Sequence, residues 1–416
     1  MRTVLTKGRD KLIAQLVARR NSVDERALPV AKRTIAGVRK GGDDALRRYA
    51  VRFDGITKQS QLRISQSELQ QAWQGISPAF RNALETAAKN IRRFAQKQLP
   101  KEWSFEQVPG LTVGQKISPL ASVGCYVPSG RYPLPSTLLM TAIPAQVAGV
   151  PRIVAVSPKP AKETLAAAAF LGITEFYRIG GAQAVAALAY GTESIPRVDK
   201  IVGPGNAFVT AAKKLVSFDC AIDMLAGPTE IVVTSENGDP ALIASDLVAQ
   251  AEHDPDALAI FITTNKELAE KISAEVKERV RGNSIAAQSI KANGVIFVAC
   301  SVTEAREITN RLAPEHLTVD SESDLEWVQN AGSVFVGCYS AQPLGDYISG
   351  PNHTLPTGGL ARVRGGLSVY DFVKAITVQQ YDRKAVETLG PKAITLAEAE
   401  GLKGHAEAIR ARGARG

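Results

Sequence analysis

The chain has 416 residues, of which 45% are hydrophobic and 22% charged, a composition typical of a soluble globular protein with two or three domains. It lacks a signal-peptide core and any apolar run of the roughly 18 to 20 residues that cross a bilayer, so we expect a cytoplasmic protein without membrane contact. The net charge of +9 does not indicate a nucleic-acid partner, because Lys and Arg are interleaved with acidic residues along the chain.

The four cysteines are far apart in the sequence. Cys125, Cys220, Cys300 and Cys338 lack the close spacing of a zinc knuckle or a redox pair, and three of them stand at the edges of apolar, strand-like runs. We therefore expect reduced, mostly buried thiols.

The first hundred residues read as a helical layer. Their start signals and periodicity predict helices over 9–19, 24–38, 43–52 and 78–96. Residues 103–124 change character, with short β-prone pieces separated by Pro and Gly that lead toward a sheet.

From residue 137 onward, predicted strands and helices alternate in two arrays. The strands of the first array are 152–156, 174–179 and 200–202, and those of the second are 230–233, 257–263, 294–298, 317–319 and 333–336. The intervening helices are 137–148, 161–170, 182–190, 207–216, 241–252, 266–280, 303–312 and 324–329. This alternation predicts parallel sheets with helical crossovers.

The last part of the chain reads as two more helices, 371–378 and 396–412, long enough to leave the body and contact a partner. The fold class that we predict is therefore α/β, with two incomplete Rossmann-like parallel-sheet domains, a helical N-terminal layer and a C-terminal helical arm.

Gln250 and His253 stand three residues apart where a predicted helix ends, so both side chains could reach one metal ion from the same face. The other three histidines, His316, His353 and His405, also lie in short polar or Gly/Pro-marked segments near carboxylates. One such histidine alone is more often a capping or surface residue, but the set indicates a shared site.

Two glycine turns follow predicted strands and precede predicted helices: Gly180-Gly181 and Gly203-Pro204-Gly205. Free backbone N–H groups at a helix N-terminus can hold a phosphate, but glycines also serve simply to shape tight turns. Both interpretations stay open, because no Gly-x-Gly-x-x-Gly fingerprint opens a helix in either array.

Several motifs in order make the chain resemble the histidinol dehydrogenase family, zinc- and NAD-dependent enzymes that end histidine biosynthesis. The motifs are Tyr126-Val127-Pro128, Pro133-Leu134-Pro135-Ser136-Thr137, Gly180-Gly181-Ala182-Gln183-Ala184, Gly203-Pro204-Gly205-Asn206, Ala226-Gly227-Pro228-Thr229-Glu230, Gln250-Ala251-Glu252-His253, Ala313-Pro314-Glu315-His316, Gly345-Asp346-Tyr347, Gly350-Pro351-Asn352-His353 and Glu400-Gly401-Leu402 before His405.

The resemblance implies a role for each matching position. The zinc ligands would be Gln250, His253, Asp346 and His405, and the NAD contacts would be Tyr126, Gln183 and Asn206. The catalytic acid/base pair would be Glu315 and His316. The substrate contacts would be Thr229, Gln250, His253, His316, Asp346, His353, Glu400 and His405. In the family the C-terminal segment reaches across a homodimer, so Glu400 and His405 would serve the neighbouring subunit.

We divide the chain into an N-terminal helical arm (1–20), a discontinuous Rossmann-like domain (21–125 and 230–366), an NAD-contacting Rossmann-like domain (126–229) and a C-terminal dimerisation arm (367–416). The expected reaction is the oxidation of L-histidinol to L-histidine by two NAD. His316 would act as base for the hydroxyl proton, and Glu315 would deprotonate the water added to the aldehyde. Zinc would orient the substrate.

Three residues depart from the usual family pattern, namely Ser129 in place of glycine, Leu225 in place of proline and Thr229 in place of serine. Two alternatives therefore remain. A paralogous enzyme with the same fold and zinc site could oxidise another small alcohol such as sulfopropanediol, although Glu400 favours a cationic amine. A zinc-stabilised binding protein without enzyme activity is the other, but the sequence lacks the clustered basic face that nucleic acid would need.

Overall fold

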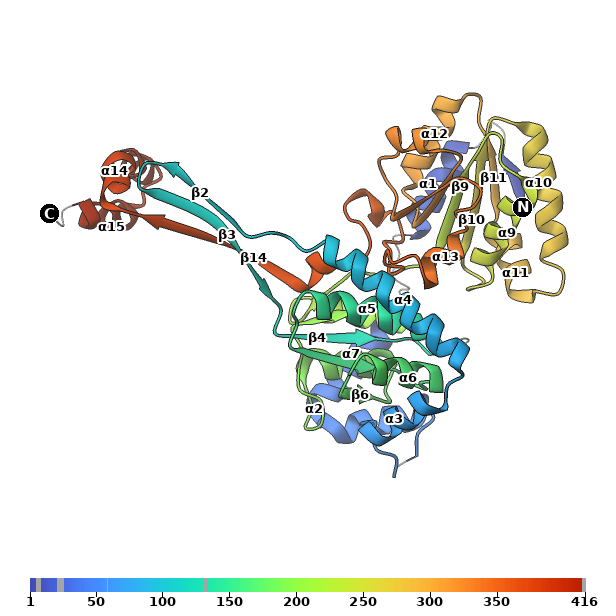
Figure 1. Ribbon diagram of the computed structural model, residues 1–416, viewed down its shortest axis with the longest axis horizontal. Helices are drawn as coiled ribbons and strands as arrows, with labels where there is room; N and C mark the ends of the chain where they lie inside the picture. The colour runs from blue at the N-terminus through green and yellow to red at the C-terminus, as the bar shows by residue number, and fades with distance from the viewer. Residues whose placement is uncertain (5–8, 21–25, 58, 130–132, 414–416) are drawn as a thin grey trace.

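The computed structural model describes residues 1–416 except 5–8, 21–25, 58, 130–132 and 414–416. Two domains, each built on a parallel sheet, lie against one another, and a long arm extends from them (Figure 1). The predicted start of a helix at residue 24 falls outside the described residues.

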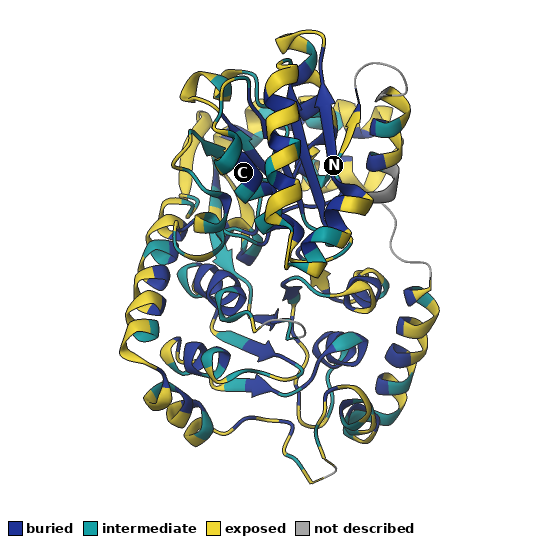
Figure 2. Ribbon diagram, turned by 90° about the vertical axis from the view of Figure 1, so that its right-hand side faces the viewer, coloured by how far each residue is buried: buried dark blue, intermediate teal, exposed yellow. Residues whose placement is uncertain are grey.

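The first domain contains a six-stranded parallel sheet in the order β1-β11-β10-β9-β12-β13. Its strands are β1 (Arg2–Val4), β9 (Glu230–Thr234), β10 (Leu258–Thr263), β11 (Val295–Val298), β12 (His316–Val319) and β13 (Ser333–Val336). Every residue of β9, β10 and β11 is buried, because helices cover both faces of the sheet (Figure 2).

The helices of the six-stranded domain are α1 (Arg9–Arg20), α9 (Pro240–Ala251), α10 (Lys266–Arg279), α11 (Ser284–Asn293) and α12 (Val302–Leu312). Polar N-cap side chains fix where four of them begin: Asp239, Asn265, Asn283 and Ser301. Each accepts a hydrogen bond from a backbone N–H of the first turn, a group that would otherwise lack a partner within the helix.

The second domain contains a five-stranded parallel sheet in the order β6-β5-β4-β7-β8. Its strands are β4 (Ser122–Tyr126), β5 (Arg152–Val156), β6 (Glu175–Tyr177), β7 (Lys200–Val202) and β8 (Ala221–Ile222), and its crossover helices are α5 (Pro135–Val147), α6 (Lys162–Phe170), α7 (Gly181–Tyr190) and α8 (Ala207–Val216). The strand order reverses beside β4, which is where open α/β sheets bind ligands at the carboxyl ends of their strands.

The N-terminal helices contradict the predicted division into domains. Helices α2 (Ala27–Phe53), α3 (Gln66–Gly75) and α4 (Pro78–Lys97) pack on α5 to α8 of the five-stranded domain, although Asn90 of α4 also donates a hydrogen bond to the Ile348 carbonyl oxygen. Residues 2–4 form no arm, since β1 is the edge strand of the six-stranded sheet. Sequence periodicity identifies which face of a helix is apolar but not which sheet covers it, and the apolar faces of α2 and α4 are buried here.

The arm is a three-stranded antiparallel sheet that carries two helices at its tip (Figure 1). Its elements are β2 (Trp103–Val108), β3 (Leu111–Pro119), β14 (Val373–Tyr381), α14 (Arg383–Ala399) and α15 (Lys403–Gly413). The predicted helix 371–378 is wrong, because residues from Val373 onward, several of them β-branched, form a strand that pairs with β3. The predicted helix 396–412 is interrupted at Gly401, whose φ of +76° ends α14.

Short elements complete the six-stranded domain and its link to the arm. They are the 3-10 helices η1 (Glu322–Glu326), η2 (Leu360–Arg362) and η3 (Val369–Phe372), and the short α-helix α13 (Gln342–Tyr347). The segment 324–329, predicted as a helix, is therefore only partly helical, as η1.

All four cysteines are free, as predicted, but only Cys125 and Cys220 are buried, whereas Cys300 and Cys338 are exposed. The two exposed thiols lie just beyond the ends of β11 and β13, where the chain has already left the sheet. No helix among the described residues is long and apolar enough to cross a membrane.

A buried ion pair fixes the loop after β7. Lys213 on α8 donates hydrogen bonds to Asp223 and to the Gly203 carbonyl oxygen, and Asp223 accepts from the Gly203 N–H at 2.7 Å. Both charged side chains are almost fully enclosed. Removal of one partner would leave the other charge buried and uncompensated.

We expect Asp223→Ala to destabilise the protein by about 3–5 kcal/mol, because the Lys213 ammonium would remain buried without its partner. The measurement is the free energy of unfolding from urea titration. Glu387→Ala, which removes the exposed pair with Arg383, is the control and should cost less than about 1 kcal/mol. Equal losses in the two variants would contradict this role for the buried pair.

Candidate functional site

A cavity of about 190 Å³ lies between the two sheet domains. Its walls come from Thr229, just before β9, and the start of β12 on one side, and from the loops that follow β7 and β8 on the other. The lining residues include Leu134, Ser136, Thr137, Gly203, Pro204, Met224, Thr229, His253, Glu315, His316, Asp346, Tyr347, His353 and Thr357. Six predicted site residues therefore meet in one place: Thr229, His253, Glu315, His316, Asp346 and His353.

Glu315 and His316 reach the cavity because α12 stops abruptly before them. Ala313 ends the helix in the left-handed region with φ +46°, Pro314 follows, and His316 is already the first residue of β12. The Glu315 carboxylate accepts hydrogen bonds from the Thr229 hydroxyl at 2.7 Å and from the Glu230 N–H at 2.8 Å. Burial raises the pKa of Glu315 despite these donors.

The His316 ring is fixed by a backbone contact. Its Nδ1 lies 3.0 Å from the Glu230 carbonyl oxygen, which can only accept, so Nδ1 carries the proton. Nε2 is buried without a hydrogen-bond partner among the described residues, and it lies 3.8 Å from an oxygen of Asp346, too far for a hydrogen bond. Burial alone would lower the pKa of His316, but the Glu315 and Asp346 carboxylates raise it to about 9.

Gln250 occupies the last turn of α9, and His253 follows just beyond the helix end. The Gln250 amide donates from Nε2 to the Thr229 hydroxyl, which in turn donates to Glu315. The other amide atom, Oε1, is completely buried, and no donor in the described part of the chain reaches it. Because a buried carbonyl oxygen without a donor is costly, it fits an atom that binds a cation.

Asp346 lies on α13, a short helix that follows β13. Its Oδ2 accepts a hydrogen bond of 2.7 Å from the Gln342 side chain one turn earlier. The backbone oxygen of Asp346 accepts from His353 Nδ1 at 2.8 Å, which directs His353 Nε2 toward the Thr137 hydroxyl, 3.3 Å away. Burial lowers the pKa of His353.

The donor set suits a divalent metal ion of intermediate hardness. An imidazole from His253, a carboxylate from Asp346 and the Gln250 amide oxygen are ligands that zinc accepts, and a fourth position would remain open. No group of three or more His, Cys, Asp and Glu side chains that could hold a metal occurs in the described part of this single chain.

Two predicted site residues are not brought to the cavity. Glu400 and His405 are exposed at the far tip of the arm, at the end of α14 and in α15 (Figure 1). Within one chain they cannot complete the set that Gln250, His253 and Asp346 begin.

The three predicted NAD contacts lie at the carboxyl edge of the five-stranded sheet. Tyr126 ends β4, Gln183 lies in the first turn of α7, and Asn206 caps α8 by accepting from the Phe208 and Val209 N–H groups. Tyr126 and Gln183 are each only 3% exposed and do not line the cavity, whereas Asn206 is exposed.

The idea that the two glycine turns offer free N–H groups to a phosphate is not supported. Gly180 N–H donates to the Asp54 carboxylate at 3.1 Å, Gly181 N–H donates to the Tyr126 hydroxyl at 3.0 Å, and Gly203 N–H donates to Asp223. These glycines form tight turns that the chain's own side chains already hold.

Sequence reasoning missed the residues that support the site, of which Gln342 and Asp54 are the clearest. Gln342 precedes Asp346 by four residues, a spacing that would have been informative if α13 had been predicted. Asp54 follows the last residue of α2 and contacts Gly180 and Gln183, which lie more than a hundred residues later in the sequence. No local sequence pattern predicts such a contact.

The three departures from the family pattern differ in their consequences. Thr229 keeps the hydroxyl that joins Gln250 to Glu315. Ser129 uses its hydroxyl to donate to the Lys159 carbonyl oxygen. Nothing in the structure explains Leu225.

Comparisons with known proteins identify the family of the chain. The histidinol dehydrogenase family model matches residues 17–413. Histidinol dehydrogenase from Methanothermobacter thermautotrophicus is 46% identical over 96% of both chains, and that from Oceanobacillus iheyensis is 45% identical over 95% of this chain and 94% of its own. The crystal structure of histidinol dehydrogenase from Elizabethkingia anophelis has a TM-score of 0.93 with 34% identity, covering 99% of this chain and 98% of that one. The chain belongs to the histidinol dehydrogenase family.

Proposed function

We propose that the protein oxidises L-histidinol to L-histidine through the aldehyde, with two NAD as hydride acceptors. The observation that carries the proposal is the His316 Nε2 atom, which is buried in the wall of a cavity shared with Glu315, His253 and Asp346 and has no hydrogen-bond partner among the residues described. A polar atom held in this way is suited to exchange a proton with a bound substrate.

The first oxidation removes a hydride from the carbinol carbon and a proton from its hydroxyl. His316 is fixed with Nδ1 as donor to the Glu230 carbonyl oxygen, so Nε2 is the atom that can accept the hydroxyl proton. The ring cannot turn without loss of that hydrogen bond. His316 is therefore positioned as the base of the first step in its neutral form, a form that the positive charge of zinc held at Asp346 would favour by offsetting the carboxylate that raises the His316 pKa.

The second oxidation requires water to add to the aldehyde before another hydride leaves. Glu315 stands beside His316, and its raised pKa makes it a stronger base than an exposed glutamate. Its carboxylate is held by the Thr229 hydroxyl and the Glu230 N–H, so it keeps one orientation. We assign to Glu315 the deprotonation of the water.

We further propose that Gln250 Oε1, His253 and Asp346 hold one zinc ion, with His405 of a second subunit as the fourth ligand. When bound, zinc supplies a positive charge that orients the amino and imidazole nitrogens of the substrate and lowers the pKa of a neighbouring imidazole. Thr229 orients the Gln250 amide so that Oε1 remains available, and Gln342 does the same for the Asp346 carboxylate.

For the cofactor and the remaining substrate contacts we propose the positions that match the family. Tyr126, Gln183 and Asn206 would contact NAD, because they lie at the carboxyl edge beside the switch point of the five-stranded sheet. His353, which lines the cavity, and Glu400, which would come from the partner's arm, would contact histidinol.

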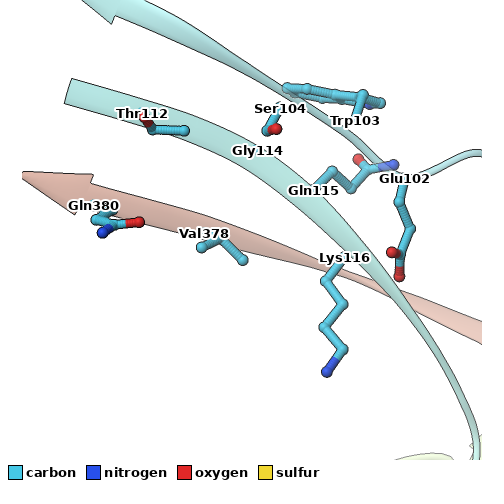
Figure 3. A pocket seen from close by; sticks show the side chains of 9 residues that line it. All are labelled: Glu102, Trp103, Ser104, Thr112, Gly114, Gln115, Lys116, Val378 and Gln380. Atoms are coloured by element: carbon cyan, nitrogen blue, oxygen red, sulfur yellow. The ribbon is translucent and has the colours of Figure 1, made fainter. Parts of the chain in front are cut away.

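The arm supports a homodimer. Seven of its large apolar side chains are between 42% and 67% exposed: Trp103, Phe105, Ile376, Val378, Tyr381, Leu396 and Leu402. Figure 3 shows the side chains that line a pocket on this sheet, Trp103 and Val378 together with polar side chains. Because β14 is exposed over almost its whole length, we propose that a second copy covers it and receives Glu400 and His405. We place the dimer in the cytoplasm, where its free thiols would stay reduced.

We expect zinc-loaded protein to form two NADH for each L-histidinol consumed, because alcohol and aldehyde are both oxidised before release. The measurement is NADH absorbance at limiting histidinol, with sulfopropanediol as the comparison substrate. One NADH per histidinol, or turnover of sulfopropanediol alone, would contradict the proposal.

Gln342→Met should weaken zinc binding by about 10- to 100-fold, because Asp346 would lose the donor that orients it. Methionine is of similar length but offers no N–H. Chelator competition on the metal-free protein gives the zinc dissociation constant, and circular dichroism checks the fold.

Gln288→Met, at an exposed position of α11, is the matched control and should leave zinc affinity unchanged. Unaltered affinity in Gln342→Met would remove the supporting role from Gln342 but not the ligand role from Asp346.

A further inference from the structure

A buried carboxylate at the carboxyl edge of the five-stranded sheet takes no part in the chemistry above. Asp54 caps the C-terminal end of α2, is only 3% exposed, and donates its backbone N–H to the Ala50 carbonyl oxygen. A buried carboxylate is expensive unless hydrogen bonds compensate it. A buried carboxylate at the edge of the sheet where ligands bind is therefore a candidate for a functional role.

One oxygen of Asp54 accepts two hydrogen bonds from the same short segment. Oδ2 lies 3.1 Å from the Gly180 N–H and 3.1 Å from Nε2 of Gln183. The first bond ties α2 to the residue that precedes α7, and the second fixes the direction of the Gln183 amide. Gln183 Nε2 thus points inward to the carboxylate, and Oε1 is the amide atom left for a ligand.

The Tyr126 hydroxyl belongs to the same arrangement. It accepts a hydrogen bond from the Gly181 N–H, so its own proton remains available as a donor. The start of α7, which attracts anions, already faces the Asp54 carboxylate. A phosphate placed there would meet that negative charge.

We propose that Asp54 is a positioning residue for the dinucleotide cofactor: it holds the Gly180-Gly181 turn and sets the Gln183 amide, and it keeps the cofactor's phosphates away from the start of α7. This rests on the proposed use of NAD at this edge. The ligand there meets uncharged groups, the Gln183 amide oxygen and the Tyr126 hydroxyl.

The groups around Asp54 act on the pKa of its carboxyl group in opposite directions. Burial raises its pKa to about 6, while the Gln183 and Gly180 hydrogen bonds and the Lys159 ammonium act in the opposite direction. Lys159 follows β5, and the Cβ of a residue in place of Gly55 would touch its side chain, so this cation lies across the turn that follows Asp54.

The test compares Asp54→Leu with wild type in the zinc-loaded, full-length enzyme. Leucine has the same branching as aspartate but no acceptor, so the Gly180 N–H and the Gln183 Nε2 would both lose the oxygen that fixes them, and the Gln183 amide would no longer keep one orientation toward the cofactor. We expect the dissociation constant of NAD, from calorimetric titration, to rise at least about tenfold, the effect of one misplaced hydrogen bond to a charged group. The KM for histidinol and the zinc content should stay unchanged.

Asp219→Leu is the matched control, because Asp219 accepts a hydrogen bond from the Tyr190 hydroxyl in the same domain but lies after α8, away from the carboxyl edge. It should leave NAD affinity unchanged. A folded Asp54→Leu enzyme with wild-type NAD affinity would overturn the proposal.

A second variant tests the proposal if Asp54→Leu fails to fold. Gln183→Met leaves Asp54 in place and removes only the amide that it orients, so NAD affinity should fall to a similar extent. Unchanged affinity would mean that Asp54 has no cofactor contact to position, and would overturn the proposal. The proposed function fails separately, if wild-type protein forms no NADH from histidinol.

Discussion

The site depends on the Thr229 hydroxyl, which joins two parts of the six-stranded domain: one that would bind the metal and one that would transfer protons. It accepts from the Gln250 amide at the end of α9 and donates to the Glu315 carboxylate before β12. One hydroxyl can do both because it is donor and acceptor at once. It thereby fixes the amide oxygen on one side and the carboxylate on the other.

This contact explains why a threonine can stand where the family usually has serine. The hydroxyl is what the Gln250 and Glu315 side chains require, and either residue supplies it. The added methyl group narrows the cavity slightly, but the hydrogen-bond chain that orders the candidate metal and acid/base groups is unchanged. The same principle recurs at Asp346, whose second oxygen is held by Gln342.

The parallel sheets were predictable from the sequence because their strands are short, nearly continuous apolar runs between helices. The residues of the cavity were predictable because the resemblance marks them one by one. The domain division failed, since the buried faces of α2 and α4 do not reveal which sheet they cover. Strand β14 was mistaken for a helix because its partner β3 lies far away in the sequence. The support from Asp54 could not be foreseen either, because it depends on packing between distant segments.

A single chain holds the cavity at one end and Glu400 and His405 at the other end of a long arm (Figure 1). The proposed activity therefore requires a dimer, since each site would combine the body of one subunit with the arm of another.

The most direct test mixes two variants that should each be inactive, His253→Asn in the body and His405→Asn in the arm, and allows their subunits to exchange. In a mixed dimer one site would receive an intact body and an intact arm, so random pairing of equal amounts should restore about a quarter of wild-type activity. If the mixture stays inactive although mixed dimers form, or if His405→Asn alone is fully active, the arm does not complete a neighbouring site.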